Sequence, residues 1–238
     1  MLPLRDLHSP KRPPLITRLL IALNVGVFLY QCVDWFMGGK GELITALGVR
    51  PLCYFHPAAC GINIKAHSEL LWEPLLASLF LHGGVLHLAF NMLFLWVFGP
   101  GVEERLGRWR FALFYLICGI AASLAHVVTH AHSSIPSIGA SGAIAGVLGL
   151  YLILLPRSWI LTYFPPIFLF PVPAPLFLVA WILLQVVSGF THLPGLLPSH
   201  AHSDIAWMAH IGGFAIGVIM GWSINPRRKA KSRRSVRA

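Results

Sequence analysis

The chain has 238 residues, of which 56% are hydrophobic and only 11% are charged, and its mean hydropathy is +0.72. A water-soluble domain of this size cannot bury so much apolar surface, so the composition indicates an integral membrane protein. The formal net charge of +10 raises the question of nucleic-acid binding, but the positions of the basic residues are those of a membrane protein. We therefore expect no nucleic-acid partner.

Apolar segments recur along the chain, and each is expected to be helical because lipid offers no other partner for backbone hydrogen bonds. We predict an all-α membrane protein built as a bundle of six transmembrane helices. The predicted spans are Leu15–Phe36, Val85–Phe98, Phe111–Thr129, Gly139–Leu155, Pro175–Gly189 and Ile205–Ile224. The second, fourth and fifth are shorter than the roughly 20 residues of a free span, which suggests that they are packed inside the bundle or extended by flanks that Gly or Pro interrupts.

The basic residues favour one orientation of these spans. If the N-terminus is cytoplasmic, 15 of the 18 Lys and Arg residues lie inside, and only Lys40, Arg50 and Lys65 lie outside. The positive-inside rule then places both termini in the cytoplasm. We expect three parts: a cytoplasmic N-terminal segment (1–14), a six-helix domain (15–224) and a basic cytoplasmic tail (225–238) attracted to anionic lipid. Basic flanks and small size favour a prokaryotic plasma membrane over an organelle.

The first predicted external loop contains Cys53 and Cys60. They could form a disulfide if the loop faces an oxidising compartment, or they could remain thiols.

The second predicted span carries two polar side chains on one face. His87 and Asn91 are four residues apart, so they point to the same side of a helix. Measured from Gly99 at the cytoplasmic end, His87 stands about 18 Å up the helix at ~1.5 Å per residue. The pair could tie helices together, or it could donate hydrogen bonds to a ligand.

The fourth predicted span opens with a serine in its first turn and should end at Pro156, just before Arg157. The rise from Ser141 to Leu155 is about 21 Å, within a hydrocarbon core of about 30 Å. Ser141 should therefore lie several ångströms below the outer membrane surface. A Gly-Ala-Ser-Gly stretch alone is weak support for catalysis, because small residues are common where membrane helices meet.

The sixth predicted span places a histidine at the same depth. His210 stands about 23 Å above Asn225 at the cytoplasmic end, which matches the depth of Ser141. A neutral histidine beside a serine can act as the base that the hydroxyl needs to become a nucleophile. We predict a Ser141–His210 dyad rather than a triad, because no span offers a carboxylate to complete a triad and Asp204 falls on a different helix face.

Glycines provide a way for these two helices to meet. On the sixth span they recur every four residues and form a smooth face that permits close helix contact. The opposing face would be provided by glycines after Ser141. The residues involved are Gly213, Gly217 and Gly221 on the sixth span, and Gly142 and Gly146 on the fourth.

With these motifs in order, the chain resembles the rhomboid intramembrane proteases over nearly its whole length. The matching stretches are His82–Asn91, Glu103–Gly107, Gly139–Gly142 and Ala209–Gly213 with Gly217. The resemblance implies a six-helix core, a water-filled cavity open to the outside and a Ser141–His210 dyad that needs no metal or other cofactor. It also implies an oxyanion site formed by His87, Asn91 and the backbone at Ser141 and Gly142, with His82 at the cavity edge. The expected partners are the lipid bilayer and transmembrane protein substrates.

Two positions depart from the family pattern. Trp72-Glu73 stands where many members have Trp-Arg, which affects contacts within the first loop. Ala145 stands where some members have an aromatic ring that stacks on the histidine, so His210 must be oriented in another way.

The segments Thr191–Ser203 and Pro165–Pro175 flank the fifth span and are either a mobile gate for substrate or rigid packing. The prolines of the second segment exclude a regular helix there.

Three other functions remain open. A catalytically silent rhomboid-like adaptor or chaperone would bind membrane helices without cutting them, and a transporter would need buried charges that these spans lack. Metal catalysis is a third alternative, but no His-Glu-x-x-His motif is present, so the clustered histidines are expected to be solvated loop residues. These histidines are His126, His130 and His132, and His200 with His202.

Overall fold

The structure is a computed structural model, and it describes residues 1–8, 10–39, 41–60, 71–191 and 206–224. Over these ranges the chain is mostly helical. Helices long and apolar enough to cross a membrane are α1 (Leu15–Phe36), α6 (Val85–Leu106), α7 (Arg108–Thr129) and α10 (Trp207–Ile224). Two shorter apolar helices are α8 (Ser141–Leu154) and α9 (Ala174–Thr191).

These six helices overlap the six predicted segments, and α1 has the predicted bounds. Length and composition alone identify four candidate spans among the described residues, because α8 and α9 fall short of the criterion. The predicted second span ends too early, at Phe98, and of the two explanations for its shortness the extension through a flank that contains Gly and Pro is confirmed. Helix α6 continues through Pro100 to Leu106, and its far end is held by Glu103, which accepts hydrogen bonds from the backbone N–H groups of Ile16 and Thr17. These contacts offset the local cost of a proline in a helix.

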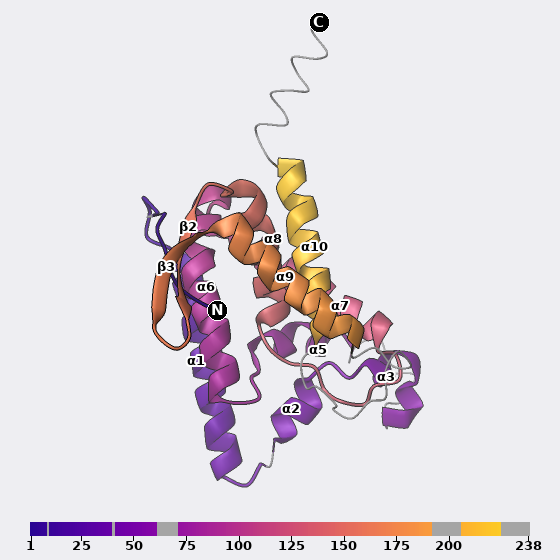
Figure 1. Ribbon diagram of the computed structural model, residues 1–238. Helices are drawn as coiled ribbons and strands as arrows, with labels where there is room; N and C mark the ends of the chain where they lie inside the picture. Colours follow the sequence, from indigo (N-terminus) through magenta and orange to yellow (C-terminus); the bar gives the residue numbers. More distant parts are fainter. Residues whose placement is uncertain (9, 40, 61–70, 192–205, 225–238) are drawn as a thin grey trace, which may run out of the picture.

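Helix α8 lies at the centre of the bundle and contacts α6, α7, α9 and α10 (Figure 1). Every residue from Gly142 to Tyr151 is buried. The core around α8 is lined by aromatic rings, among which Phe98 packs edge-on against Tyr151 with 5.1 Å between ring centroids. A short helix enclosed on all sides needs no full span of lipid-facing residues, which explains its length.

Helices α8 and α10 meet backbone to backbone. A Cβ atom placed on Gly213 would overlap the carbonyl oxygen of Gly142, and one on Gly217 would overlap that of Gly146. A Cβ atom placed on Gly149 would likewise overlap the carbonyl oxygen of Phe214. Only glycine permits this approach, so these residues set the distance between the two helices.

The prediction of an all-α protein is wrong in one region. Strands β1 (Leu2–Asp6), β2 (Trp159–Phe164) and β3 (Phe168–Pro173) form an antiparallel sheet in the order β1-β2-β3. Prolines in the segment between α8 and α9 prevent helix formation there, and the apolar and β-branched residues around them suit a hairpin. The sheet lies at one side of the bundle, next to α6 (Figure 1).

Short helices fill the described part of the loop between α1 and α6. They are α2 (Glu42–Leu47), α3 (Pro51–Phe55), η1 (Pro57–Cys60), α5 (Trp72–Ala77) and η3 (Ser78–Phe80). Cys53 and Cys60, for which sequence left two states open, form a disulfide. The basic tail 225–238 lies outside the described residues.

Candidate active site

The segment that leads into α8 is tightly positioned. Ser137 and Val49 exchange backbone hydrogen bonds of 2.8 and 3.0 Å, and the N–H of Gly139 donates to the carbonyl oxygen of Ser78 at 2.8 Å. Gly139 has a φ of +118°, a conformation that residues with a Cβ rarely adopt. The turn delivers Ser141 as the first residue of α8, where backbone N–H groups have no partner within the helix and the helix dipole favours negative charge.

On α10, the ring of His210 is buried and held by a hydrogen bond. Its Nδ1 lies 2.8 Å from the side-chain oxygen of Gln185 on α9. The amide nitrogen of Gln185 donates to the carbonyl oxygen of Trp181 at 3.3 Å, which turns the amide oxygen toward the histidine. An amide oxygen only accepts, so Nδ1 must carry the proton and Nε2 is left with a free lone pair. The His210 ring therefore has the tautomer that a general base requires.

Aromatic rings surround His210, although Ala145 offers none. The ring of Trp181 lies 5.9 Å from that of His210, centroid to centroid, and the ring of Trp207 lies edge-on at 6.1 Å. The orientation that sequence left unexplained is thus provided by α9 and by α10 itself.

Helix α6 brings His87 and Asn91 to the same place. A Cβ atom on Gly139 would lie 2.8 Å from Nε2 of His87 and 3.6 Å from Nδ2 of Asn91, so the glycine lets the turn lie close to both nitrogens. Asn91 is buried, and in the described part of the chain its Nδ2 has no hydrogen-bond partner. A buried amide donor without a partner is costly in a native structure and is often functional.

These side chains line a single cavity of about 720 Å³, the Ser141 cavity. Its wall includes Ser141 from α8, His210 from α10, and His87 and Asn91 from α6, with Gln185 from α9. No hydrogen bond joins Ser141 to His210 among the described residues, as is common in active sites without substrate. A serine hydroxyl, a histidine with the proton on Nδ1 and an amide donor in one partly apolar cavity are suited to acyl transfer.

Comparison with known proteins identifies the family. The model of the Rhomboid domain matches residues 69–227, which is more than half of the chain. The chain belongs to the rhomboid family. This rhomboid is 39% identical to the "Rhomboid protease GluP" of Bacillus subtilis over 138 residues, which are 57% of this chain and 24% of that protein. It is 34% identical to "Rhomboid protein 1, mitochondrial" of Saccharomyces cerevisiae over 168 residues, 69% of this chain and 45% of that protein.

A third relative, the "Putative rhomboid protease YdcA" of Bacillus subtilis, is 38% identical over 126 residues, 52% of this chain and 62% of that protein. The rhomboid thus spans less than half of the first two relatives and less than two thirds of the third. Together with the apolar helices, the comparisons establish a multi-pass membrane protein of a protease family. The relatives include mitochondrial and plant proteins as well as bacterial ones.

The structure places His82 behind the cavity rather than in its wall. Its side chain is 1% exposed, its backbone exchanges hydrogen bonds with the Gln31 side chain on α1, and its ring packs edge-on against His87 at 5.1 Å. Burial, aided by the nearby His87, lowers the pKa of His82 to about 4. A neutral ring in this position supports His87 from behind.

The remaining candidates divide into those that the structure describes and those that it does not. The expectation that the clustered histidines are solvated loop residues is wrong for His126, which is buried on α7. Its ring stacks on His130, and the ring of His132 stacks on His56. The described residues contain no group of three or more His, Cys, Asp or Glu that could hold a metal ion. Asp204, His200, His202 and most of the candidate gate Thr191–Ser203 lie outside the described residues.

Sequence reasoning missed Gln185. It is one of few polar residues in a highly apolar helix and is 8% exposed. A buried amide in a membrane span is a functional signal in itself, but its distance from the other motifs along the chain concealed its partner.

Proposed function

We propose that this rhomboid is an intramembrane serine endopeptidase that cuts transmembrane segments of membrane proteins, with Ser141 as nucleophile and His210 as general base. The observation that carries the proposal is the convergence of both residues in the wall of one cavity, where Gln185 holds Nδ1 of His210 and leaves Nε2 free. The proposal includes six membrane spans with both termini cytoplasmic, in a prokaryotic plasma membrane.

The first step is acylation. As the Ser141 oxygen attacks the scissile carbonyl carbon, Nε2 of His210 takes the hydroxyl proton, and a tetrahedral intermediate with a negatively charged oxygen forms. Gln185 accepts from Nδ1 throughout, so the positive charge that develops on the ring is stabilised where it forms. His210 then gives its proton to the leaving amine, and the C–N bond breaks to leave an ester on Ser141. Water, activated by the same histidine, hydrolyses that ester.

The oxyanion is bound by donors of residues in the cavity wall. In the described part of the chain Nδ2 of Asn91 has no hydrogen-bond partner, and His87 lies beside it at the Gly139 turn. The N-terminal N–H groups of α8, at Ser141 and Gly142, add the field of a helix N-terminus. Donors that are in place before the charge appears need little reorganisation, and each such group is worth roughly a hundredfold or more in rate.

The test is cleavage of a single-span model substrate in liposomes by the wild type and by Ser141→Ala and His210→Ala. Cleavage should disappear in both variants and survive a metal chelator. A fluorophosphonate, which reacts with activated serines, should label the wild type but neither variant. Cleavage that persists in Ser141→Ala would exclude this nucleophile.

The same experiment separates the protease from an adaptor that binds helices without cutting. An adaptor would retain the substrate without cleaving it, and Ser141→Ala would bind as the wild type does. No observation on the described residues favours that function, since both residues required for chemistry are present at the cavity.

A further inference from the structure

A second cavity, of about 630 Å³, lies at the opposite end of α8 from Ser141. We call it the basic cavity. Its wall is formed by the ends of α6, α8 and α10, the start of α7, and the residues that follow β1. Helix α8 has 14 residues, so the two cavities are about 20 Å apart along its axis at ~1.5 Å per residue. The basic cavity therefore takes no part in the proposed chemistry.

The charged side chains of this cavity are all basic. Arg105, Arg110 and Arg157 line it together with His8, and none of the described Asp or Glu residues belongs to its wall. Among the described residues, none of the three arginines takes part in an ion pair, and all three are exposed. Guanidinium groups that converge without a carboxylate repel one another, and a bound anion relieves that repulsion.

Most of the rest of the wall is apolar. Leu106, Ile153, Leu154 and Trp159 contribute to it, and Trp159 is 49% exposed. Tryptophan is enriched where a membrane meets water, and sequence predicts that this end of the bundle faces the cytoplasm. A ligand that satisfies both parts of the wall has an anionic group and a long apolar part.

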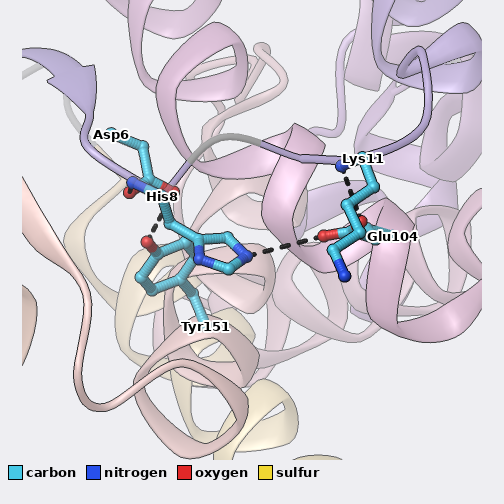
Figure 2. A network of polar contacts seen from close by, with 5 residues as sticks. All are labelled: Asp6, His8, Lys11, Glu104 and Tyr151. Carbon is cyan, nitrogen blue, oxygen red and sulfur yellow. Dashed lines mark hydrogen bonds and ion pairs between the residues drawn. The ribbon is translucent and has the colours of Figure 1, made fainter.

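The N-terminal side of the cavity is held in place without a ligand (Figure 2). The hydroxyl of Tyr151 donates to Asp6 at 2.6 Å, and the backbone N–H of His8 donates to the same carboxylate at 2.8 Å. Glu104 accepts from the backbone N–H of Lys11 at 2.8 Å and forms an ion pair of 3.5 Å with the ring of His8. The two acidic residues are therefore occupied in fixing the wall and do not neutralise the arginines.

We propose that the basic cavity binds a phosphate ester, and that its source is the headgroup of an anionic phospholipid. Arginine matches phosphate with paired, charge-assisted hydrogen bonds, and basic pockets between membrane helices bind anionic headgroups. The acyl chains lie over the apolar wall toward the bilayer. A soluble phosphate ester shares the anionic chemistry but leaves the apolar wall unused.

The experiment uses the full chain purified in detergent, with native mass spectrometry to measure bound phosphatidylglycerol against phosphatidylcholine. The test variant is Arg105→Gln/Arg110→Gln/Arg157→Gln. The control is Arg12→Gln/Arg18→Gln/Arg108→Gln, which removes the same charge from exposed arginines on the same predicted side that do not line the cavity. A third variant replaces the cavity arginines with lysine, which keeps the charge and loses the paired geometry.

We expect the wild type and the control to retain phosphatidylglycerol in preference to phosphatidylcholine. About 1 kcal/mol per basic residue is roughly fivefold in affinity, so the glutamine variant should bind on the order of a hundredfold more weakly, and the lysine variant should lie between. Equal loss in the control would overturn the site in favour of general surface attraction, and unchanged binding in the glutamine variant would also overturn it.

Two further arms distinguish the ligand's source. If glycerol phosphate displaces the lipid at equal concentration, the ligand is a soluble phosphate ester and the lipid assignment is wrong. If an acidic peptide binds to the same arginines and phosphatidylglycerol does not compete with it, the phosphate assignment is wrong. Fluorophosphonate labelling of Ser141 or an unchanged gel-filtration profile shows that each variant is folded, so the outcome does not depend on cleavage.

Discussion

Replacing Gln185 with leucine tests how the base is oriented. The change removes the oxygen that lies 2.8 Å from Nδ1 of His210 and keeps a side chain of similar size in a site that is 8% exposed. A hydrogen bond to a group that becomes charged is worth about 1.5–3 kcal/mol, so at 1.36 kcal/mol per decade kcat should fall about 10- to 150-fold. KM should stay nearly unchanged, because the bond strengthens only as the ring becomes positive.

The assay is steady-state cleavage in liposomes with two matched variants. Val187→Ala changes the same helix at a position that is 61% exposed, and it should leave kcat unaltered. Gln185→Glu retains an oxygen acceptor, so it should recover part of the rate that Gln185→Leu loses. The reasoning would be refuted if Gln185→Leu kept the wild-type kcat, or if Gln185→Glu and Gln185→Leu were equally impaired while both remained folded.

Three other changes probe the site and its support. Asn91→Ala should lower kcat by roughly 100- to 1000-fold, which is the cost of losing one oxyanion donor, and should change the thermal midpoint little. An unaltered kcat would show that Asn91 does not belong to the oxyanion site. Gly213→Ala should lower both the thermal midpoint and activity because its Cβ has no room beside the Gly142 carbonyl, whereas Ala215→Val on the exposed face should not. His82, whose pKa falls from 6.5 to about 4 in the folded chain, takes up a proton more readily when unfolded. The thermal midpoint should therefore fall as the pH is lowered from about 6.5 to about 4, and His82→Gln should lose less over that range.

Much of the helical framework could be predicted from the sequence because hydropathy in a membrane is a strong signal. The predicted first span coincides with α1, and the depth argument brought Ser141 and His210, which are 69 positions apart in the chain, to one cavity. The depth of a residue in a membrane helix can be predicted because the rise per residue is constant. Ser141 and His210 could be chosen for this comparison because they are polar residues in apolar segments.

What could not be predicted depends on contacts between distant segments. The sheet pairs Pro3 with Thr162, and neither stretch has a sheet signal strong enough to suggest a partner so far away along the chain. Helix α6 passes Pro100 because Glu103 is bound by the start of α1, which no local propensity reports. His82 was expected at the cavity edge by resemblance, whereas its backbone bonds to Gln31 draw it behind His87.

The glycine contact between α8 and α10 fixes the distance between these two helices, while other helix contacts in the protein can vary. Because two backbones touch there, the distance between the helices that carry Ser141 and His210 does not respond to side-chain repacking. The proposed side-chain oxyanion donors lie on α6 and the amide that orients His210 lies on α9. Helix α6 contacts α8 through side chains such as the rings of Phe98 and Tyr151. Substitutions on α6 and α9 can therefore change the shape of the Ser141 cavity, while the distance between α8 and α10 stays the same.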